Sequence, residues 1–286
     1  MIGQNLKTNF RIFTLLSVLT GLFIGAGYII GGRGGMILGL FFAGIMNFAS
    51  YWYSDKIVLK MYGAEKISEE ENPDLHKMVE RLAEDAGIPK PKVYMNDMEV
   101  PNAFATGRNP EKGVVCVTKG LMNTLNDEEI EGVIAHELAH IKNRDTLINA
   151  VVATIAGAVG ILAEMAFWGA MFGGREEESD MISALVLMIL TPLIATIIRM
   201  AVSRSMEFRA DRDAVKISGN RKGLSSALEK ISEASSRPLK GHASRSQEAG
   251  ANLFISNPFS GDKITKYFST HPPLDERLEN IESTEL

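Results

Sequence analysis

The chain has 286 residues, a formal net charge of −5 at pH 7 and a single cysteine, Cys116. The acidic balance offers no basic footprint for DNA or RNA, so we expect no nucleic-acid partner. A single cysteine excludes an intrachain disulfide and is compatible with a reducing compartment.

The first apolar region is long enough to cross a membrane twice. Residues 12–32 and 34–54 carry no charge, and only Arg33 separates these two stretches of 21 residues. A helix of that length spans a hydrocarbon core of about 30 Å. A cleavable signal peptide is the alternative for the first stretch, but its apolar part is usually only about 7–15 residues long. The glycines that allow close contact between the two helices are Gly21, Gly25, Gly35 and Gly39.

A mixed, more polar segment follows the hairpin. Apolar residues at helical spacing predict a helix from Pro73 to Gly87, with His76 outside the apolar set and therefore on the solvated surface. Strand-like runs follow at Lys92–Met95, Asn102–Thr106 and Val114–Thr118. We interpret Cys116 in the last run as a buried strand residue rather than a reactive thiol. A small sheet is therefore expected before the next helix.

Residues 136–140 read His-Glu-Leu-Ala-His, and the chain has only five histidines. On a helix, His136 and His140 lie one turn apart on the same face, so their imidazoles can meet one zinc ion, with Glu137 beside it to move a proton. Asn126 and the three acids after it predict the cap and first turn of this helix. The alternative is two helix-surface histidines without a metal.

A second pair of apolar stretches lies downstream. Residues 146–163 and 181–198 are uncharged, and Pro192 predicts a kink in the second of them. We interpret them as a second membrane hairpin; the alternative is a pair of buried helices in a soluble core, because 18 residues is near the lower limit for a span. Glu164 approaches Arg199 if the two helices pack antiparallel; the favoured alternative is that Glu164 lies at an interface or in a polar cavity.

Basic residues near the ends of the spans predict the orientation. The outer ends carry Lys7, Arg11, Lys56, Lys60 and Lys66, whereas the two interhelix turns carry Arg33 and Arg175. The positive-inside rule therefore puts both termini and residues 55–145 in the cytosol. The size suits the plasma (inner) membrane of a prokaryote.

Zinc needs a third protein ligand, and the segment after the fourth apolar stretch offers one. If residues 203–211 are helical, Glu207 can ligate zinc while Asp211, one turn away, accepts a hydrogen bond from a ligand histidine. The alternative is a solvated, salt-bridged face with Arg204, Arg209 and Arg212. If the zinc helix and this helix continue out of the membrane, His140 and Glu207 both lie within about 10 Å of its cytosolic boundary. His242 lies in a Ser/Gly-rich stretch, residues 235–261, which is a lid or a disordered loop.

These residues resemble the HtpX family of membrane-bound zinc metallopeptidases, relatives of the Ste-type CAAX prenyl proteases. The likeness covers essentially the whole chain. It is carried by both hairpins, the pentad 136–140, Glu207-Phe208-Arg209-Ala210-Asp211, Pro101-Asn102-Ala103-Phe104-Ala105 and Thr270-His271-Pro272-Pro273. The related prenyl proteases have more spans and a large chamber that four spans cannot enclose, so a CAAX substrate is not expected.

The resemblance implies one Zn²⁺ per chain with Glu207 as its third ligand, a gluzincin-type core and a role in membrane-protein quality control. It implies that His271 donates a hydrogen bond to the tetrahedral intermediate; the alternative is a helix-boundary residue ahead of Pro272. It also implies that substrate lies against an edge strand formed by Asn102, Ala103, Phe104 and Ala105. An exposed strand binds extended peptides through backbone hydrogen bonds.

The sequence therefore predicts an α+β, mainly helical membrane protein with four transmembrane helices and a cytosolic gluzincin-like zinc peptidase domain that contains a small β-sheet. Residues 1–54 and 146–202 form the two transmembrane hairpins. Residues 55–145 and 203–286 form the two parts of the peptidase domain, the first with the zinc-binding helix and the second with the third zinc ligand. The expected partners are the lipid bilayer and peptide substrates, namely misfolded or damaged membrane proteins. Glu137 acts as the general base and then passes its proton to the leaving amine. The oligomeric state is not predicted.

Two rivals remain. A structural zinc clamp between the hairpins needs four protein ligands, so Asp211 or His271 would have to bind the metal directly. A small transporter using Glu164 and Arg199 leaves the histidine pentad unexplained.

Overall fold

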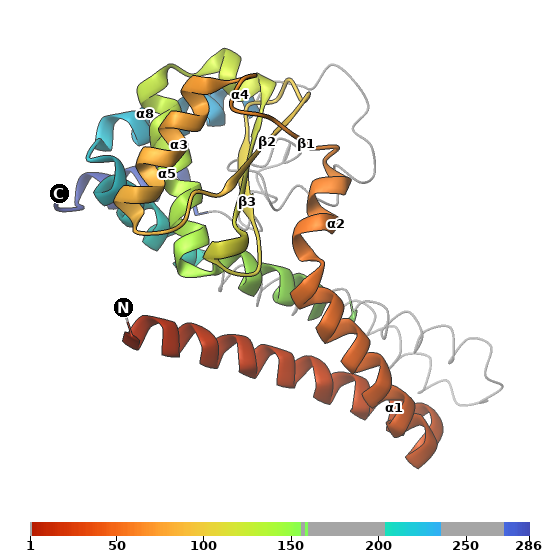
Figure 1. Ribbon diagram of the computed structural model, residues 1–286. Helices are drawn as coiled ribbons and strands as arrows, with labels where there is room; N and C mark the ends of the chain where they lie inside the picture. Colours follow the sequence, from red (N-terminus) through yellow and green to blue (C-terminus); the bar gives the residue numbers. More distant parts are fainter. Residues whose placement is uncertain (1, 156–157, 160–203, 236–271) are drawn as a thin grey trace. The chain divides into compact units, whose positions relative to one another are not determined.

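The structure is a computed structural model, which describes residues 2–155, 158–159, 204–235 and 272–286. The chain divides into two compact units, the first of residues 1–53 and 148–201 and the second of residues 54–147 and 202–286. The described elements are mainly helical, with one four-stranded mixed sheet in the second unit (Figure 1).

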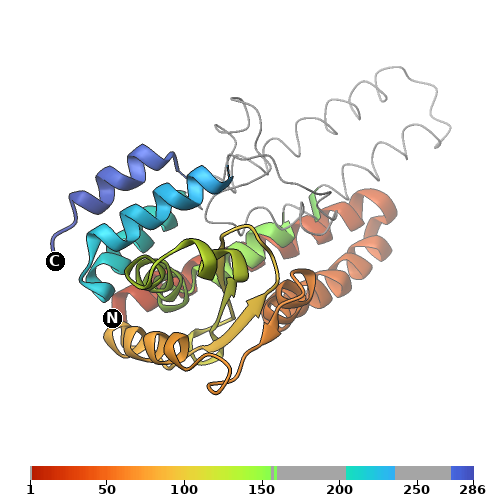
Figure 2. The same ribbon diagram turned by 90° about the horizontal axis from the view of Figure 1, so that it is seen from above.

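Helix α1 (Ile2–Trp52) in the first unit contains two segments long and apolar enough to cross a membrane, Thr8–Tyr28 and Gly32–Trp52. They lie where the sequence predicts two N-terminal spans. The chain turns at Gly32, whose φ of +58° lies in the left-handed region. The red limbs of this turn are visible in Figures 1 and 2.

Hydrogen bonds and glycines hold these limbs together. Asn47 Nδ2 donates to Thr20 Oγ1 at 2.9 Å across them. A methyl group at Gly35 or Gly39 would collide with the backbone of the other limb, whereas Gly21 and Gly25 face open space. The predicted contact role is therefore correct for the second pair of glycines and wrong for the first.

The third apolar region begins with a short helix, Asp145–Ile155. The expectation that the helix of the histidine pentad continues into this region is wrong. Helix α5 (Asp127–Asn143) ends at Arg144, whose φ of 58° is left-handed, and the next helix begins afterwards. The rest of the predicted second hairpin, with Glu164, Pro192 and Arg199, lies outside the described residues, as do residues 236–271.

The sheet of the second unit has the order β1-β2-β4-β3. Strand β2 pairs parallel with β4, while β1 and β3 add antiparallel to the two sides. The strand bounds are Glu65–Lys66 (β1), Lys92–Asn96 (β2), Ala103–Thr106 (β3) and Val114–Thr118 (β4). The three predicted strands are therefore present, and β1 is additional.

Helices cover both faces of this sheet, which explains why β4 is a continuous apolar run. Val115 and Val117 face the main core, and Cys116 faces a smaller cluster with Tyr62 and Phe104. In Figure 1 helices α3, α5 and α8 lie on one side of the sheet and α2 on the other. The helix bounds are Ser54–Met61 (α2), Pro73–Ala86 (α3), Lys119–Thr124 (α4), Arg221–Ser235 (α8) and Leu274–Glu282 (α11). Figure 2 shows α11 beside α8.

Helix α5 is central because it carries the histidine pentad. Asn126 and Glu129 form the predicted cap as a reciprocal capping box. A methyl group at Gly132 would meet the backbone of Leu224, so this glycine permits close packing of α5 and α8. From Ile130 to Ile141 every residue except Glu131 is buried, which places this part of the helix in the core.

The predicted exposure of His76 is wrong. This side chain is only 7% exposed, and its Nε2 lies 3.2 Å from the carbonyl oxygen of Ile67. This backbone contact gives Nε2 a polar partner beneath the chain that leads into α3. Helical periodicity alone cannot reveal this, because the covering segment lies outside the helix.

Candidate metal centre

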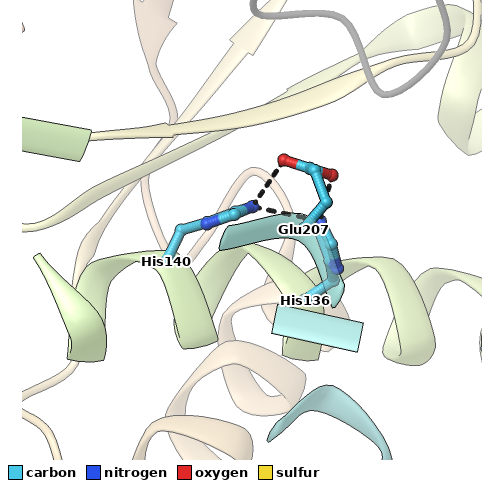
Figure 3. Close-up of side chains that lie close together, drawn as sticks. All are labelled: His136, His140 and Glu207. Carbon is cyan, nitrogen blue, oxygen red and sulfur yellow. Dashed lines mark hydrogen bonds and ion pairs between the residues drawn. The ribbon is translucent and has the colours of Figure 1, made fainter. Parts of the chain in front are cut away.

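Two helices bring three potential metal ligands together. Helix α5 supplies His136 and His140, and a helix of residues 204–218 supplies Glu207. The two Nε2 atoms are 3.1 Å apart, and they lie 3.5 and 3.4 Å from the carboxylate oxygens of Glu207. Figure 3 shows both rings and the carboxylate pointing toward one another.

These distances match the donor set of a tetrahedral metal site. Ligand atoms about 2.0–2.1 Å from a zinc ion at tetrahedral angles lie roughly 3.3 Å from one another. All three side chains are buried, with 2%, 8% and 3% of the surface of His136, His140 and Glu207 exposed. Imidazole nitrogens with a carboxylate oxygen suit a borderline cation such as zinc.

The other ring nitrogen of His136 faces Asp211. The distance from Nδ1 to Asp211 Oδ1 is 3.0 Å. The guanidinium of Arg277 donates two hydrogen bonds, of 2.6 and 2.9 Å, to the carboxylate of Asp211. Because both oxygens of Asp211 are engaged by these partners, its geometry is that of an orienting group and not of a fourth ligand. The sequence indicates only an unspecified acid of the core as the partner of Arg277, and that partner, Asp211, lies 66 residues away along the chain.

The other ring nitrogen of His140 faces a residue that sequence reasoning missed. Asp145 is fully buried, its Oδ2 lies 3.1 Å from His140 Nδ1, and its Oδ1 accepts a bond from Arg209. The sequence feature that points to this partner of His140 is an acidic residue five positions after it. Helical periodicity argued against it, because a continuous helix would place Asp145 away from His140.

Because each Nδ1 lies about 3 Å from a carboxylate oxygen, we expect the proton of each neutral ring on Nδ1, which leaves both Nε2 lone pairs toward the centre. The charges around them also favour a cation. Four buried carboxylates and two guanidiniums give −4 and +2, a net −2 with neutral rings, which a divalent ion balances. The carboxylates are Glu137, Asp145, Glu207 and Asp211, and the guanidiniums are Arg209 and Arg277.

The pKa shifts of His136, His140 and Asp211 also indicate surroundings that favour positive charge at the centre. Burial lowers the pKa of His136, but hydrogen bonds that its ring donates to Asp211 and Glu207 outweigh burial and raise the pKa. For His140, burial again acts downward, while Asp145 and Glu207 raise the pKa well above its ordinary value. Burial raises the pKa of Asp211, and Arg277 more than reverses this. Positive charge at the centre is therefore stabilised.

The remaining predicted site residues are placed as follows. Glu137 is 4% exposed on α5. Burial lowers the pKa of Arg277, but Asp211, Glu207 and, to a smaller extent, Glu137 outweigh burial and raise it. Asn102 precedes β3, and Ala103, Phe104 and Ala105 lie within it, with buried side chains. His271 lies outside the described residues.

Residues 69–285 match the family model of peptidase family M48. The chain belongs to peptidase family M48. A Protease HtpX homolog from Persephonella marina is 52% identical over 271 residues, which are 93% of this chain and 94% of that protein. A Protease HtpX homolog from Pyrococcus furiosus is 51% identical over 275 residues, 95% and 94% of the two chains. The HtpX resemblance seen in the sequence is thereby confirmed.

The M48 chain also resembles a solved structure, the crystal structure of S. mikatae Ste24p, with a TM-score of 0.54. The two are 19% identical, and the match covers 99% of this chain and 67% of the other. At this identity the likeness concerns the fold alone. Family membership and the HtpX relatives make this M48 protein a metallopeptidase and a membrane protease, with a cluster suited to a metal ion.

Proposed function

We propose that this M48 protein is a zinc-dependent endopeptidase of the prokaryotic plasma (inner) membrane that cleaves unfolded or damaged membrane proteins at the cytosolic face. Zinc is held by His136, His140 and Glu207, one ion per chain. The observation that carries the proposal is the convergence of these donor atoms at 3.1–3.5 Å separations in a buried cluster of net negative charge.

When bound, zinc supplies a Lewis acid and lowers the pKa of coordinated water. Glu137 accepts a proton from the attacking water on its carboxylate and passes it to the leaving amine, so that peptide and water become a carboxylate and an amine. Asp211 keeps the Nδ1 proton on His136, which directs Nε2 to the centre. His271 supplies the hydrogen bond that stabilises the developing oxyanion.

The substrate strand is Asn102 to Ala105. The carbonyl oxygen of Asn102 accepts a hydrogen bond from the N–H of Thr118 at 2.9 Å. Backbone groups along an antiparallel strand point alternately to its two sides, so those of Phe104 also pair with β4. The backbone groups of Ala103 and Ala105 therefore face the other edge. Along the described part of the chain no strand pairs with that edge. An extended, unfolded substrate can add there through backbone bonds with little demand on its sequence.

In the proposed topology, residues 1–54 and 146–202 each form a hairpin of two transmembrane helices, and both termini lie in the cytosol. The two parts of the gluzincin-type peptidase, residues 55–145 and 203–286, then share the cytosolic side. The lysines that follow the first hairpin, at positions 56, 60 and 66, support this orientation. Cleavage of a membrane-protein substrate in inside-out but not in sealed right-side-out vesicles would test it.

The main test uses the full-length protein purified in detergent, stripped of metal by a chelator and then given zinc. Cleavage of casein and of an unfolded membrane protein is measured. We expect zinc-dependent cleavage by the wild type. Glu137→Gln should retain one zinc ion but lose about 10² to 10⁴ in turnover, because the base is missing.

Glu131→Gln is the matched control, since Glu131 lies on the same helix and pairs with Arg81 at the surface. It should cleave like the wild type. Full activity of Glu137→Gln would overturn the role of Glu137. Stoichiometric zinc without cleavage in any protein would instead favour the structural clamp, and a folded wild type that binds no zinc would refute the metal site.

A further inference from the structure

The turn after helix α5 has an unusual backbone. Arg144 has φ 58° and ψ 28°, and among the described residues it is the only one other than glycine with a positive φ. Its N–H bonds to the carbonyl oxygens of His140 and Ile141 and so closes the helix. A residue with a Cβ rarely adopts this left-handed conformation, because the Cβ crowds the backbone. The conformation is therefore found where contacts with the surrounding structure stabilise it.

The break determines where Asp145 lies. In an uninterrupted helix, a residue five positions after His140 would be rotated by about 140° around the axis and would point away from it. The left-handed turn at Arg144 instead brings the Asp145 carboxylate to 3.1 Å from His140 Nδ1. The contact thus depends on a local conformation that continuing α5 would abolish.

Asp145 is also fixed from its other side. Its second oxygen accepts a bond from Arg209, which stands two residues after Glu207 on the helix of residues 204–218. The next residue, Thr146, donates from Oγ1 to the carbonyl oxygen of Gly107 at 2.7 Å, directly after strand β3. The turn therefore ties a histidine of α5 to the helix that carries Glu207.

We propose that Asp145 is a positioning residue for His140, held in place by Arg209 and by the left-handed turn at Arg144. It accepts a hydrogen bond from Nδ1–H, fixes the tautomer, and keeps Nε2 directed at Glu207, as Asp211 does for His136. This inference rests on the proposed zinc site. Loss of an orienting carboxylate typically lowers metal affinity about 10–100-fold.

The test measures zinc release from the zinc-loaded, full-length protein in detergent, timed with a coloured chelator. Asp145→Ala should release zinc about 10–100 times faster than the wild type. Asp145→Asn should lie between them, because its amide oxygen still accepts a hydrogen bond from Nδ1–H but carries no charge for Arg209. Asp213→Asn is the matched control, since its partner is Asn143 at 2.7 Å, and it should release zinc like the wild type.

A second measurement separates positioning from general stability. In the cobalt-loaded proteins, the visible absorption bands of the metal should shift in Asp145→Asn and stay unchanged in Asp213→Asn. The melting temperatures of the metal-free proteins are recorded alongside. If Asp145→Ala does not fold, Asp145→Asn alone decides the release rate and the spectrum.

Wild-type release rates and an unshifted cobalt spectrum in the folded Asp145 variants would overturn this inference and leave the proposed function standing. A wild type that binds no zinc would overturn the proposed function and this inference with it. Equal acceleration in Asp145→Asn and Asp213→Asn would also overturn it, because the effect would then follow loss of any nearby carboxylate.

Discussion

The Nε2 atoms of His136 and His140 face each other at 3.1 Å, while each Nδ1 faces a buried carboxylate. Two nitrogen lone pairs this close repel unless a positive charge lies between them. The carboxylate of Glu207, 3.4 and 3.5 Å from the two nitrogens, completes three corners of a tetrahedron. A metal ion or a proton on one ring supplies that positive charge, and the donor set of two imidazoles and a carboxylate suits a metal, which leads to the first prediction.

Glu207→Gln should abolish stoichiometric zinc binding and cleavage together, because a neutral amide replaces the charged ligand. Zinc should stabilise the wild type by about 4 kcal/mol when free zinc exceeds its dissociation constant a thousandfold. Thermal unfolding with and without zinc, beside metal analysis, checks this. Glu229→Gln, at an exposed position on α8, should keep the zinc-dependent rise in melting temperature. A zinc-replete, active Glu207→Gln protein would contradict the ligand assignment.

Arg277→Met should destabilise the fold by about 3–5 kcal/mol, because it leaves Asp211 buried without its guanidinium partner. Denaturant unfolding of the metal-free protein measures the change without interference from zinc. Arg212→Met is the control, since Arg212 makes an exposed hydrogen bond to Asn280. Its effect should stay within about 0.5 kcal/mol. Equal stability of Arg277→Met and wild type would show that Asp211 does not depend on this pair.

The parts of the site predictable from sequence are those set by local geometry. His136 and His140 share a face because they are four residues apart on one helix, and Asn126 with Glu129 caps that helix for equally local reasons. Strand β4 was recognisable because helices on both sides of the sheet require apolar residues throughout it.

The parts that could not be predicted depend on a backbone break or on long-range contacts. Asp145 reaches His140 only because Arg144 is left-handed, and no periodic pattern signals that turn. Arg277 reaches Asp211 across 66 residues of sequence. His76 is buried by the segment around Ile67, which its own helix does not reveal. Each case needs the tertiary fold to be known first.

The buried carboxylate of Glu129 should contribute acid-sensitive stability. Burial raises its pKa, but hydrogen bonds from Lys230, Ser226 and the Asn126 N–H outweigh burial and lower it. A carboxylate with a lowered folded pKa stabilises the fold above its unfolded pKa of about 4.3, and this contribution is lost as the pH falls through the folded pKa.

Glu129→Gln should therefore cost about 1–3 kcal/mol at neutral pH, since charge-assisted bonds to Lys230 and Ser226 are weakened. The cost should shrink as the pH falls below the unfolded pKa of about 4.3 and through the lower folded pKa, because the unfolded chain takes up the proton first. Unfolding free energies measured from pH 3 to 7 test both statements. Glu128→Gln, exposed on the same helical turn, is the control. A cost that does not change with pH would show that the charge of Glu129 contributes nothing.

The thiol of Cys116 should be chemically inert in the folded protein. Burial, with a further contribution from Glu137, raises its pKa to about 12. At pH 8 only about 10⁻⁴ of such a thiol is ionised, and the thiolate is the reactive form. Iodoacetamide should leave the native protein unmodified and label it fully after denaturation, as mass spectrometry would show. Labelling of the native chain at the rate of a free thiol would mean that β4 opens to solvent beside the metal centre, and the buried sheet packing described for Cys116 would then be wrong.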